Sequence, residues 1–180
     1  MFLDSHMKIP KEESYTFNTP SEVANFFLKK AWDEDVYITV MKLIKILWFA
    51  YGFWLALTGK KLFNETFEAW RYGPVVPSIY HEFKRFGKDP IPEGELSKIL
   101  DPYSKNWVSA PHISGDIDLE KFLEKIWELY GDFTSRQLVD LTHKSNTPWH
   151  KEYVAGLLHK EISDSITKEY FEEEIKRLTA

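Results

Sequence analysis

The residues of this sequence best equipped for chemistry are its six histidines and the acidic residues beside them. His150 and Glu152 reproduce the His-x-Glu pair of zinc-dependent deaminases, but such a site also needs cysteine ligands, and the sequence contains no cysteine. No two histidines have the i, i+4 spacing that places two imidazoles on one face of a helix. A metal-dependent hydrolase built from His81, His143 and His150 is therefore an alternative without a supporting motif, and we expect no metal and no cofactor.

Other catalytic patterns give no stronger signal. The sequence has no glycine-rich phosphate loop and no Gly-x-Ser-x-Gly nucleophile elbow. A Ser-His-Asp set can be chosen from any chain of this length, so it carries no weight. No motif supplies both a nucleophile and a base at a spacing suited to catalysis. The sequence therefore indicates a binding protein and not an enzyme.

Aromatic side chains, which serve recognition more often than catalysis, make up 16% of the residues and include seven tryptophans. Rings of this size fill cores and also anchor interfaces. Three tryptophans lie inside apolar helical stretches and are expected in the core: Trp48, Trp54 and Trp127. Trp70, Tyr72 and Trp149 lie beside turns, where a ring can pack inward and still expose one edge. For these three residues, core packing and surface recognition both stay open.

Capping signals locate the first two helices that must position these rings. Thr19, Pro20 and Glu22 form a capping box with proline at the first helical position, and they predict a helix that runs to about residue 32. Thr39 predicts the start of a second helix, and Gly59 supplies a left-handed stop for it.

The second helix, over residues 40–58, is apolar nearly all round, so we expect it at the centre of the fold. Lys42 and Lys45 interrupt its start and leave an apolar run well short of the ~20 residues that a membrane span needs. We expect both lysines at a solvated end of this helix. Gly52 and Ala56 lie four residues apart, where the backbone of a neighbour could approach closely.

The remaining chain also has mostly helical signals. Pro77 predicts a third helix that ends at Gly87, and a short strand pair is compatible with residues 61–72. The proline-rich stretch 88–116 is expected to be a long loop with one helical turn near residues 96–100. Four further helices are expected near residues 119–130, 135–141, 149–158 and 167–178. The sequence thus predicts a mainly α, compact single-domain bundle of about six to eight helices, with room for one short β-hairpin.

The domain is expected to cover residues 19–180, whereas residues 1–18 are expected to be disordered or derived from an expression vector. The net charge of −5 argues against a general nucleic-acid binder, because phosphate contacts need a basic surface. The absence of cysteine fits a reducing compartment, and residues 1–20 lack the pattern of a secretory signal. We therefore expect a cytoplasmic protein that uses neither a membrane nor nucleic acid as a partner.

A series of short motifs follows a specific order between residues 42 and 149. They are Lys42-Leu43 continuing to Trp48-Phe49-Ala50 with Gly52, Gly59-Lys60, Leu62-Phe63, Phe67-Glu68-Ala69-Trp70, Tyr72-Gly73-Pro74-Val75-Val76-Pro77 with Tyr80, Leu141-Thr142-His143, and Pro148-Trp149. With these motifs, nearly all of residues 21–171 resembles the Panacea domain, also called the SocA-like or GepA-like antitoxin family. The order and spacing of the motifs together make this resemblance specific.

The resemblance implies a mainly helical domain that serves as the antitoxin of a bacterial or phage toxin–antitoxin pair. Members of the family neutralise unrelated toxins, commonly by direct binding, so the implied partner is a cognate protein toxin encoded nearby. Some members instead promote proteolysis of the toxin. An adaptor that delivers the toxin to a cellular protease is therefore the alternative.

We expect the toxin-binding surface around the turn at residues 70–80 and the connection at residues 143–149, where aromatic edges and irregular backbone coincide. The residues expected to contribute are Trp70, Tyr72, Pro74, Val75, Tyr80, His143 and Trp149. Each of these motif residues could serve the scaffold or the interface, and the sequence leaves both roles open.

Overall fold

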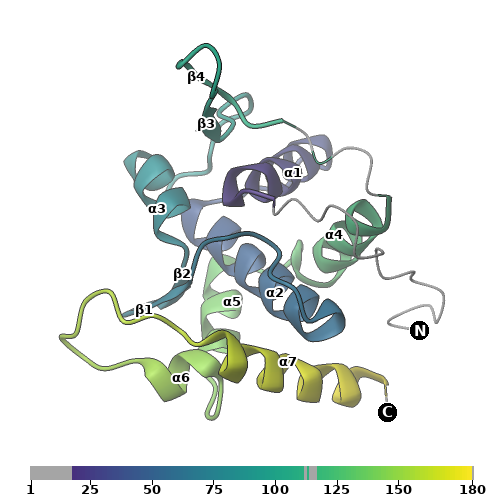
Figure 1. Cartoon of the computed structure of the whole chain (residues 1–180), viewed down its shortest axis with the longest axis vertical. Helices are drawn as coiled ribbons and strands as arrows, with labels where there is room; N and C mark the ends of the chain where they lie inside the picture. Colours follow the sequence, from purple (N-terminus) through teal and green to yellow (C-terminus); the bar gives the residue numbers. More distant parts are fainter. Residues whose placement is uncertain (1–17, 112, 114–116, 180) are drawn as a thin grey trace.

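The computed structural model describes residues 18–111, 113 and 117–179. Within these residues it contains seven α-helices, a 3₁₀ helix at Lys84–Phe86 and two antiparallel strand pairs (Figure 1). The helices are α1 (Pro20–Asp33), α2 (Val40–Thr58), α3 (Pro77–Phe83), α4 (Ile117–Tyr130), α5 (Ser135–Thr142), α6 (Pro148–Glu152) and α7 (Asp164–Thr179). The strands are β1 (Glu68–Trp70), β2 (Gly73–Val75), β3 (Lys98–Leu100) and β4 (Trp107–Ser109). The prediction of a mainly α fold with six to eight helices is confirmed, and one hairpin more is present than expected.

The central position of α2 is also confirmed. It packs against α1, α4, α5 and α7, and nearly all of its side chains are buried. It is the one described helix long and apolar enough to cross a membrane, but 83% of its most apolar stretch is buried inside the protein. Its apolar surface is therefore covered by other helices of the same chain.

Helix α7 approaches α2 closely at Gly52. A methyl group on Gly52 would lie 2.0 Å from a ring carbon of Phe171, so this position accepts only glycine without movement. The expectation of a close approach is right in its location, but the neighbour is a side chain and not a backbone. Ring contacts at 4.8 Å to Phe53 and 5.8 Å to Trp48 hold Phe171 in place.

The predicted capping residues occupy their expected places. Thr19 and Glu22 form the predicted reciprocal capping box at α1. Gly59 ends α2 in the left-handed region, with φ of 69°. Local signals in the sequence therefore locate these helix ends correctly.

The expected loop with a helical turn at residues 96–100 is wrong, because residues 98–109 form the β3–β4 hairpin. Hydrogen bonds from distant parts of the chain hold the hairpin base in an extended form. The Asn25 side chain accepts from the Ser97 amide at 2.7 Å and donates to the Ser97 carbonyl at 3.0 Å. Partners 72 residues away in sequence are not visible to a local analysis.

Two helix boundaries differ from the predictions. Helix α6 ends at Glu152 and not near residue 158, because the following chain extends to pair with β1. In this pairing the Ala69 amide donates to the Lys160 carbonyl at 2.7 Å, and the Ile162 amide donates to the Phe67 carbonyl at 2.7 Å. Helix α7 begins at Asp164, three residues before the predicted start at residue 167. The division into residues 1–18 and a single domain at 19–180 stays a prediction, and residues 1–17 lie outside the described part.

Candidate protein-binding site

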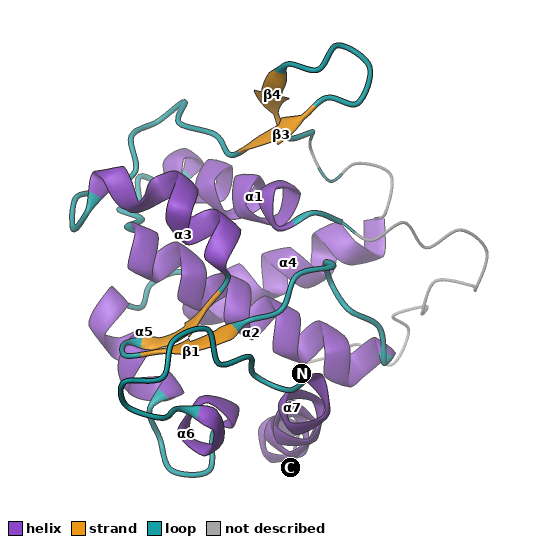
Figure 2. Cartoon of the chain, turned by 60° about the vertical axis from the view of Figure 1, so that its left-hand side comes forward, coloured by secondary structure: helices purple, strands orange, loops and turns teal. Residues whose placement is uncertain are grey.

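The predicted site centres on the β1–β2 hairpin, which packs against α2 and α5 (Figure 2). Its strands pair Glu68 with Val75 and Trp70 with Gly73, so Arg71 and Tyr72 form a two-residue turn. Gly73 has φ of 102°, a conformation that favours glycine. A carbon added there would lie 2.6 Å from Thr142 Oγ1 and 2.8 Å from Lys45 Cε. The hairpin is thus pressed tightly against the core at this residue.

Lys45 holds the same hairpin from inside the core. Its side chain is 0% exposed, and its Nζ donates a hydrogen bond of 2.8 Å to the Pro74 carbonyl. Burial lowers the pKa of Lys45 to about 7, because desolvation disfavours the charged form. The amine of Lys45 is therefore buried, loses its proton readily and is hydrogen-bonded to the backbone of β2.

The expectation that Lys42 and Lys45 lie at a solvated helix end is wrong for both residues. Lys42 is also buried, its Nζ lies 5.7 Å from the centroid of the Trp127 ring, and burial lowers its pKa. Near the start of α2, Lys42 faces Trp127 of α4 and Lys45 is bonded to Pro74 of β2. A lysine in an apolar run can mark a solvated helix end, but here the Lys45 amine binds a backbone carbonyl and the Lys42 amine faces an indole ring.

Several predicted contact residues are buried. Trp149 is only 7% exposed, its Nε1 donates to the Trp70 carbonyl at 2.7 Å, and its ring stacks on Tyr153 at 4.7 Å. Pro74 and Val75 are likewise buried. These three residues hold the hairpin in shape and offer little surface to a partner.

Trp70 and Tyr80 are half-buried and pack edge to face, with ring centroids 4.8 Å apart. The Trp70 Nε1 donates to the Glu68 carboxylate at 2.6 Å. This pair links β1 to α3 and leaves part of each ring at the surface.

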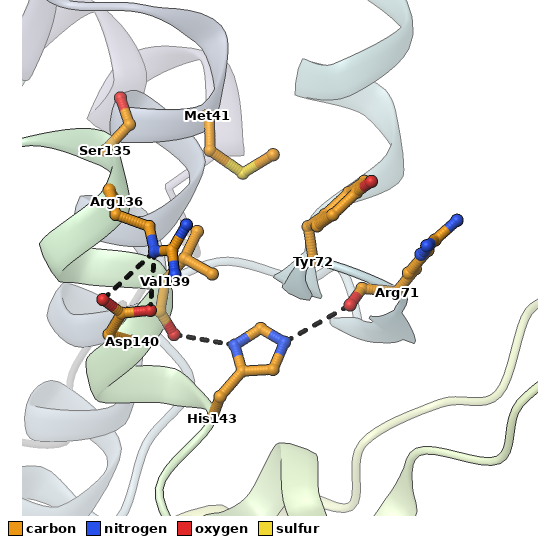
Figure 3. A pocket seen from close by; sticks show the side chains of 8 residues that line it. All are labelled: Met41, Arg71, Tyr72, Ser135, Arg136, Val139, Asp140 and His143. Carbon is orange, nitrogen blue, oxygen red and sulfur yellow. Dashed lines mark hydrogen bonds and ion pairs between the residues drawn. The ribbon is translucent and has the colours of Figure 1, made fainter.

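Tyr72 is the predicted contact residue that the fold exposes most clearly, at 56%. It stands at the hairpin turn beside Arg71, whose guanidinium lies 5.4 Å from the Tyr72 ring centroid. Both residues line an open pocket of about 560 Å³ between the turn, α5 and the start of α2 (Figure 3). The lining residues are Met41, Arg71, Tyr72, Ser135, Arg136, Val139, Asp140 and His143.

His143 lines this pocket and connects α5 to the hairpin turn (Figure 3). Its Nδ1 lies 2.7 Å from the Val139 carbonyl and its Nε2 lies 3.3 Å from the Arg71 carbonyl. Since both ring nitrogens face backbone acceptors, His143 is placed as a clamp and not as a base facing solvent. Its ring also contacts Trp149, with centroids 3.8 Å apart.

The charged side chains of the pocket differ in their partners. Arg136 Nε pairs with Asp140 at 3.0 Å on the rim, while Arg71 has no ion pair among the described residues. Ser135 Oγ is hydrogen-bonded to Thr39 Oγ1 at 2.8 Å. In the described part of the chain, no three His, Asp or Glu side chains gather in a metal-binding geometry. The pocket lining therefore combines aromatic and apolar side chains with two arginines and one aspartate.

A model of the family described as antitoxin SocA-like, Panacea domain matches residues 43–150. The chain belongs to this family. Antitoxin SocA of Caulobacter vibrioides (strain NA1000 / CB15N) is 35% identical over 127 residues, which cover 71% of this chain and 66% of that relative. The chain therefore spans just under two thirds of that relative's length. No solved structure matches this chain significantly.

The family match confirms the resemblance identified from the motifs, and its span includes every residue of the predicted site and both hairpins. Sequence reasoning did not find two features within that span. One is the internal role of Lys45, whose signal is a lysine with aliphatic residues on both sides in the middle of a helix. The other is the β3–β4 hairpin, whose signal is two short apolar runs on either side of the turn-forming sequence Asp101-Pro102 to Asn106.

Proposed function

We propose that this protein is the antitoxin of a toxin–antitoxin pair and neutralises a protein toxin, encoded nearby, by binding it directly. The observation that carries the proposal is membership of the SocA-like antitoxin family over residues 43–150. A 35% identical relative bears the name antitoxin, which supports the same role. The protein acts in the cytoplasm under this proposal, in keeping with a sequence that has no cysteine.

The geometry of the Tyr72 pocket supports direct binding. Tyr72 and Arg71 are exposed on a turn whose base is fixed by buried groups: Lys45, Thr142 and Trp149. Tyrosine and arginine are enriched among interface residues that contribute most to affinity, and a rigid support lowers the entropic cost of binding. A stable complex buries roughly 1,200–2,000 Å² in total, so the pocket forms one part of a larger contact surface.

Growth of cells that express the toxin tests the proposal. Expression of the neighbouring gene alone should arrest growth, and co-expression of this chain should restore growth and yield a complex that co-purifies. Tyr72→Ala should weaken the rescue while the helical circular dichroism spectrum is unchanged. Tyr37→Ala, which alters a tyrosine that is 82% exposed on another loop, is the matched control and should rescue fully. Failure of the unmodified chain to restore growth against any neighbouring gene product would refute the antitoxin role.

A further inference from the structure

The β3–β4 hairpin carries two strongly exposed aromatic side chains that lie outside the predicted site. Tyr103 is 94% exposed and Trp107 is 68% exposed, whereas most large apolar side chains of this protein are buried. The cross-strand register places Leu100 directly opposite Trp107 and Lys98 opposite Ser109. Since side chains of a strand alternate between two faces, Leu100, Trp107 and Lys98 share one face. An apolar pair with a lysine beside it thus forms a continuous surface.

The hairpin projects from the body of the protein (Figures 1 and 2), and side chains of α1 and α3 are hydrogen-bonded to its base. Asn25 is 1% exposed, and its amide binds the backbone of both strands' ends, at the Ser97 and Ala110 carbonyls. Glu82 of α3 accepts a hydrogen bond of 2.8 Å from the Lys98 amide and binds the Ser97 hydroxyl. Exposed rings on a fixed support are pre-organised for a partner, because little freedom is lost on binding.

The charge of the hairpin indicates the chemistry of that partner. Lys98 and Lys105 are exposed and form no ion pair among the described residues. Asp101 is the one acidic residue between them in the sequence. The Asp101 carboxylate accepts hydrogen bonds from the Tyr103 and Ser104 amides. These bonds lower the pKa of Asp101, and the bond from Ser104 has the largest effect. The Asp101 carboxylate is thus bonded to the backbone of the turn. The hairpin therefore offers rings with two free cations, on a chain whose net charge is −5.

We propose that the β3–β4 hairpin is a second docking element for the toxin and inserts Trp107 and Tyr103 into an apolar cleft with an acidic rim on the toxin surface. This inference rests on the proposed antitoxin function and adds to it the chemistry of the surface that is recognised. The apolar face made by Leu100 and Trp107 contacts the cleft, and Lys98 and Lys105 pair with carboxylates at its edge. The toxin thus contacts this chain at two separate places, the pocket lined by Tyr72 and the β3–β4 hairpin.

Isothermal titration calorimetry with the purified growth-arresting product of the neighbouring gene tests this inference. Trp107→Ala and Tyr103→Ala should each weaken binding about 10- to 100-fold, as expected for large rings central to an interface. The double variant Lys98→Glu, Lys105→Glu should weaken it at least as much and reverse the dependence of affinity on salt. Tyr37→Ala should bind within about twofold of the unmodified chain. Hydrogen exchange of residues 98–109 should slow in the complex.

The outcomes separate this inference from the function on which it rests. If the unmodified chain binds the toxin and the Trp107 and Tyr103 variants bind equally well, the hairpin inference is overturned and the antitoxin function stands. If the unmodified chain binds no neighbouring gene product, both are overturned. If Trp107→Ala leaves toxin affinity unchanged but converts a dimer of this chain to monomers, the hairpin joins two copies and the inference is again overturned. Circular dichroism of each variant checks that the fold is intact.

Discussion

The β1–β2 hairpin packs against α2 and α5 and has buried residues along all of β2, whereas the β3–β4 hairpin leaves every residue of β4 exposed. The two have strands of equal length and both carry tryptophan. Lys45, Thr142 and Trp149 fix the first hairpin along its length. Asn25 and Glu82 hold the second only at its base. The packing behind a hairpin, and not its ring content, therefore decides which of its aromatic side chains are covered by the core.

The sharpest way to break this comparison is to remove one tryptophan from each region. Trp149→Ala deletes a buried indole and leaves the Trp70 carbonyl without its donor, so the free energy of unfolding should fall by about 3–5 kcal/mol. Trp107→Ala, on the exposed hairpin, should change it by no more than about 0.5 kcal/mol. Urea denaturation followed by circular dichroism measures both values. Equal losses in the two variants would show that the hairpins do not differ in this way.

A pair of glycines sharpens the comparison further. Gly73 of β2 and Gly94, which precedes β3, both have positive φ, at 102° and 88°. Replacement by alanine should therefore strain both, by about 1–2 kcal/mol. Only Gly73→Ala also meets neighbours, at Thr142 and Lys45, since nothing lies within 4 Å of a carbon added at Gly94. Gly73→Ala should lower the free energy of unfolding by about 2 kcal/mol more than Gly94→Ala. Equal losses in thermal or urea melts would mean that β2 is not tightly packed.

The pH dependence of stability distinguishes the buried lysine from an exposed one. The folded-state pKa of Lys45 is lowered to about 7, whereas an unfolded lysine has a pKa of about 10.4. Between pH 7 and pH 9 the unfolded chain therefore binds more protons, and the free energy of unfolding should rise with pH by up to about 1.4 kcal/mol per unit. Below pH 7 the folded chain carries the full cost of the buried charge.

Lys45→Met should remove the contribution of Lys45 to the rise of the free energy of unfolding with pH. Lys98→Met, on the exposed hairpin, should retain it. Urea denaturation at half-unit pH steps measures the slope in all three proteins. A slope that is unchanged in Lys45→Met would contradict the assignment of a buried, readily deprotonated amine to this position.

Local signals in the sequence were sufficient for most of the helices. The capping box at Thr19 and the stop at Gly59 depend on residues within one or two turns, so both ends could be predicted. The β3–β4 hairpin could not be predicted in this way, because Asn25 fixes its base from 72 residues away. The short α6 has a similar cause, since residues 160–162 leave the helical path to pair with the strand segment at residues 67–69.

The fold brings only some of the predicted site residues together at the surface, and their role in toxin binding stays a prediction. Tyr72 and His143 line one pocket, as their place in the sequence suggested, while Trp149, Pro74 and Val75 turn inward. Exposure of a ring beside a turn depends on which distant element covers it, and the motif alone does not contain that information. The same reason explains Lys45, because an amine inside an apolar helix can face solvent or a carbonyl of another element.

The most direct test of direct neutralisation is a purified mixture of this chain and its toxin with no protease present. The toxin's activity should fall in proportion to the amount of this chain added, and the two proteins should elute together in size-exclusion chromatography. A toxin that stays fully active with this chain in excess, and loses activity only when a protease is added, would contradict neutralisation by binding.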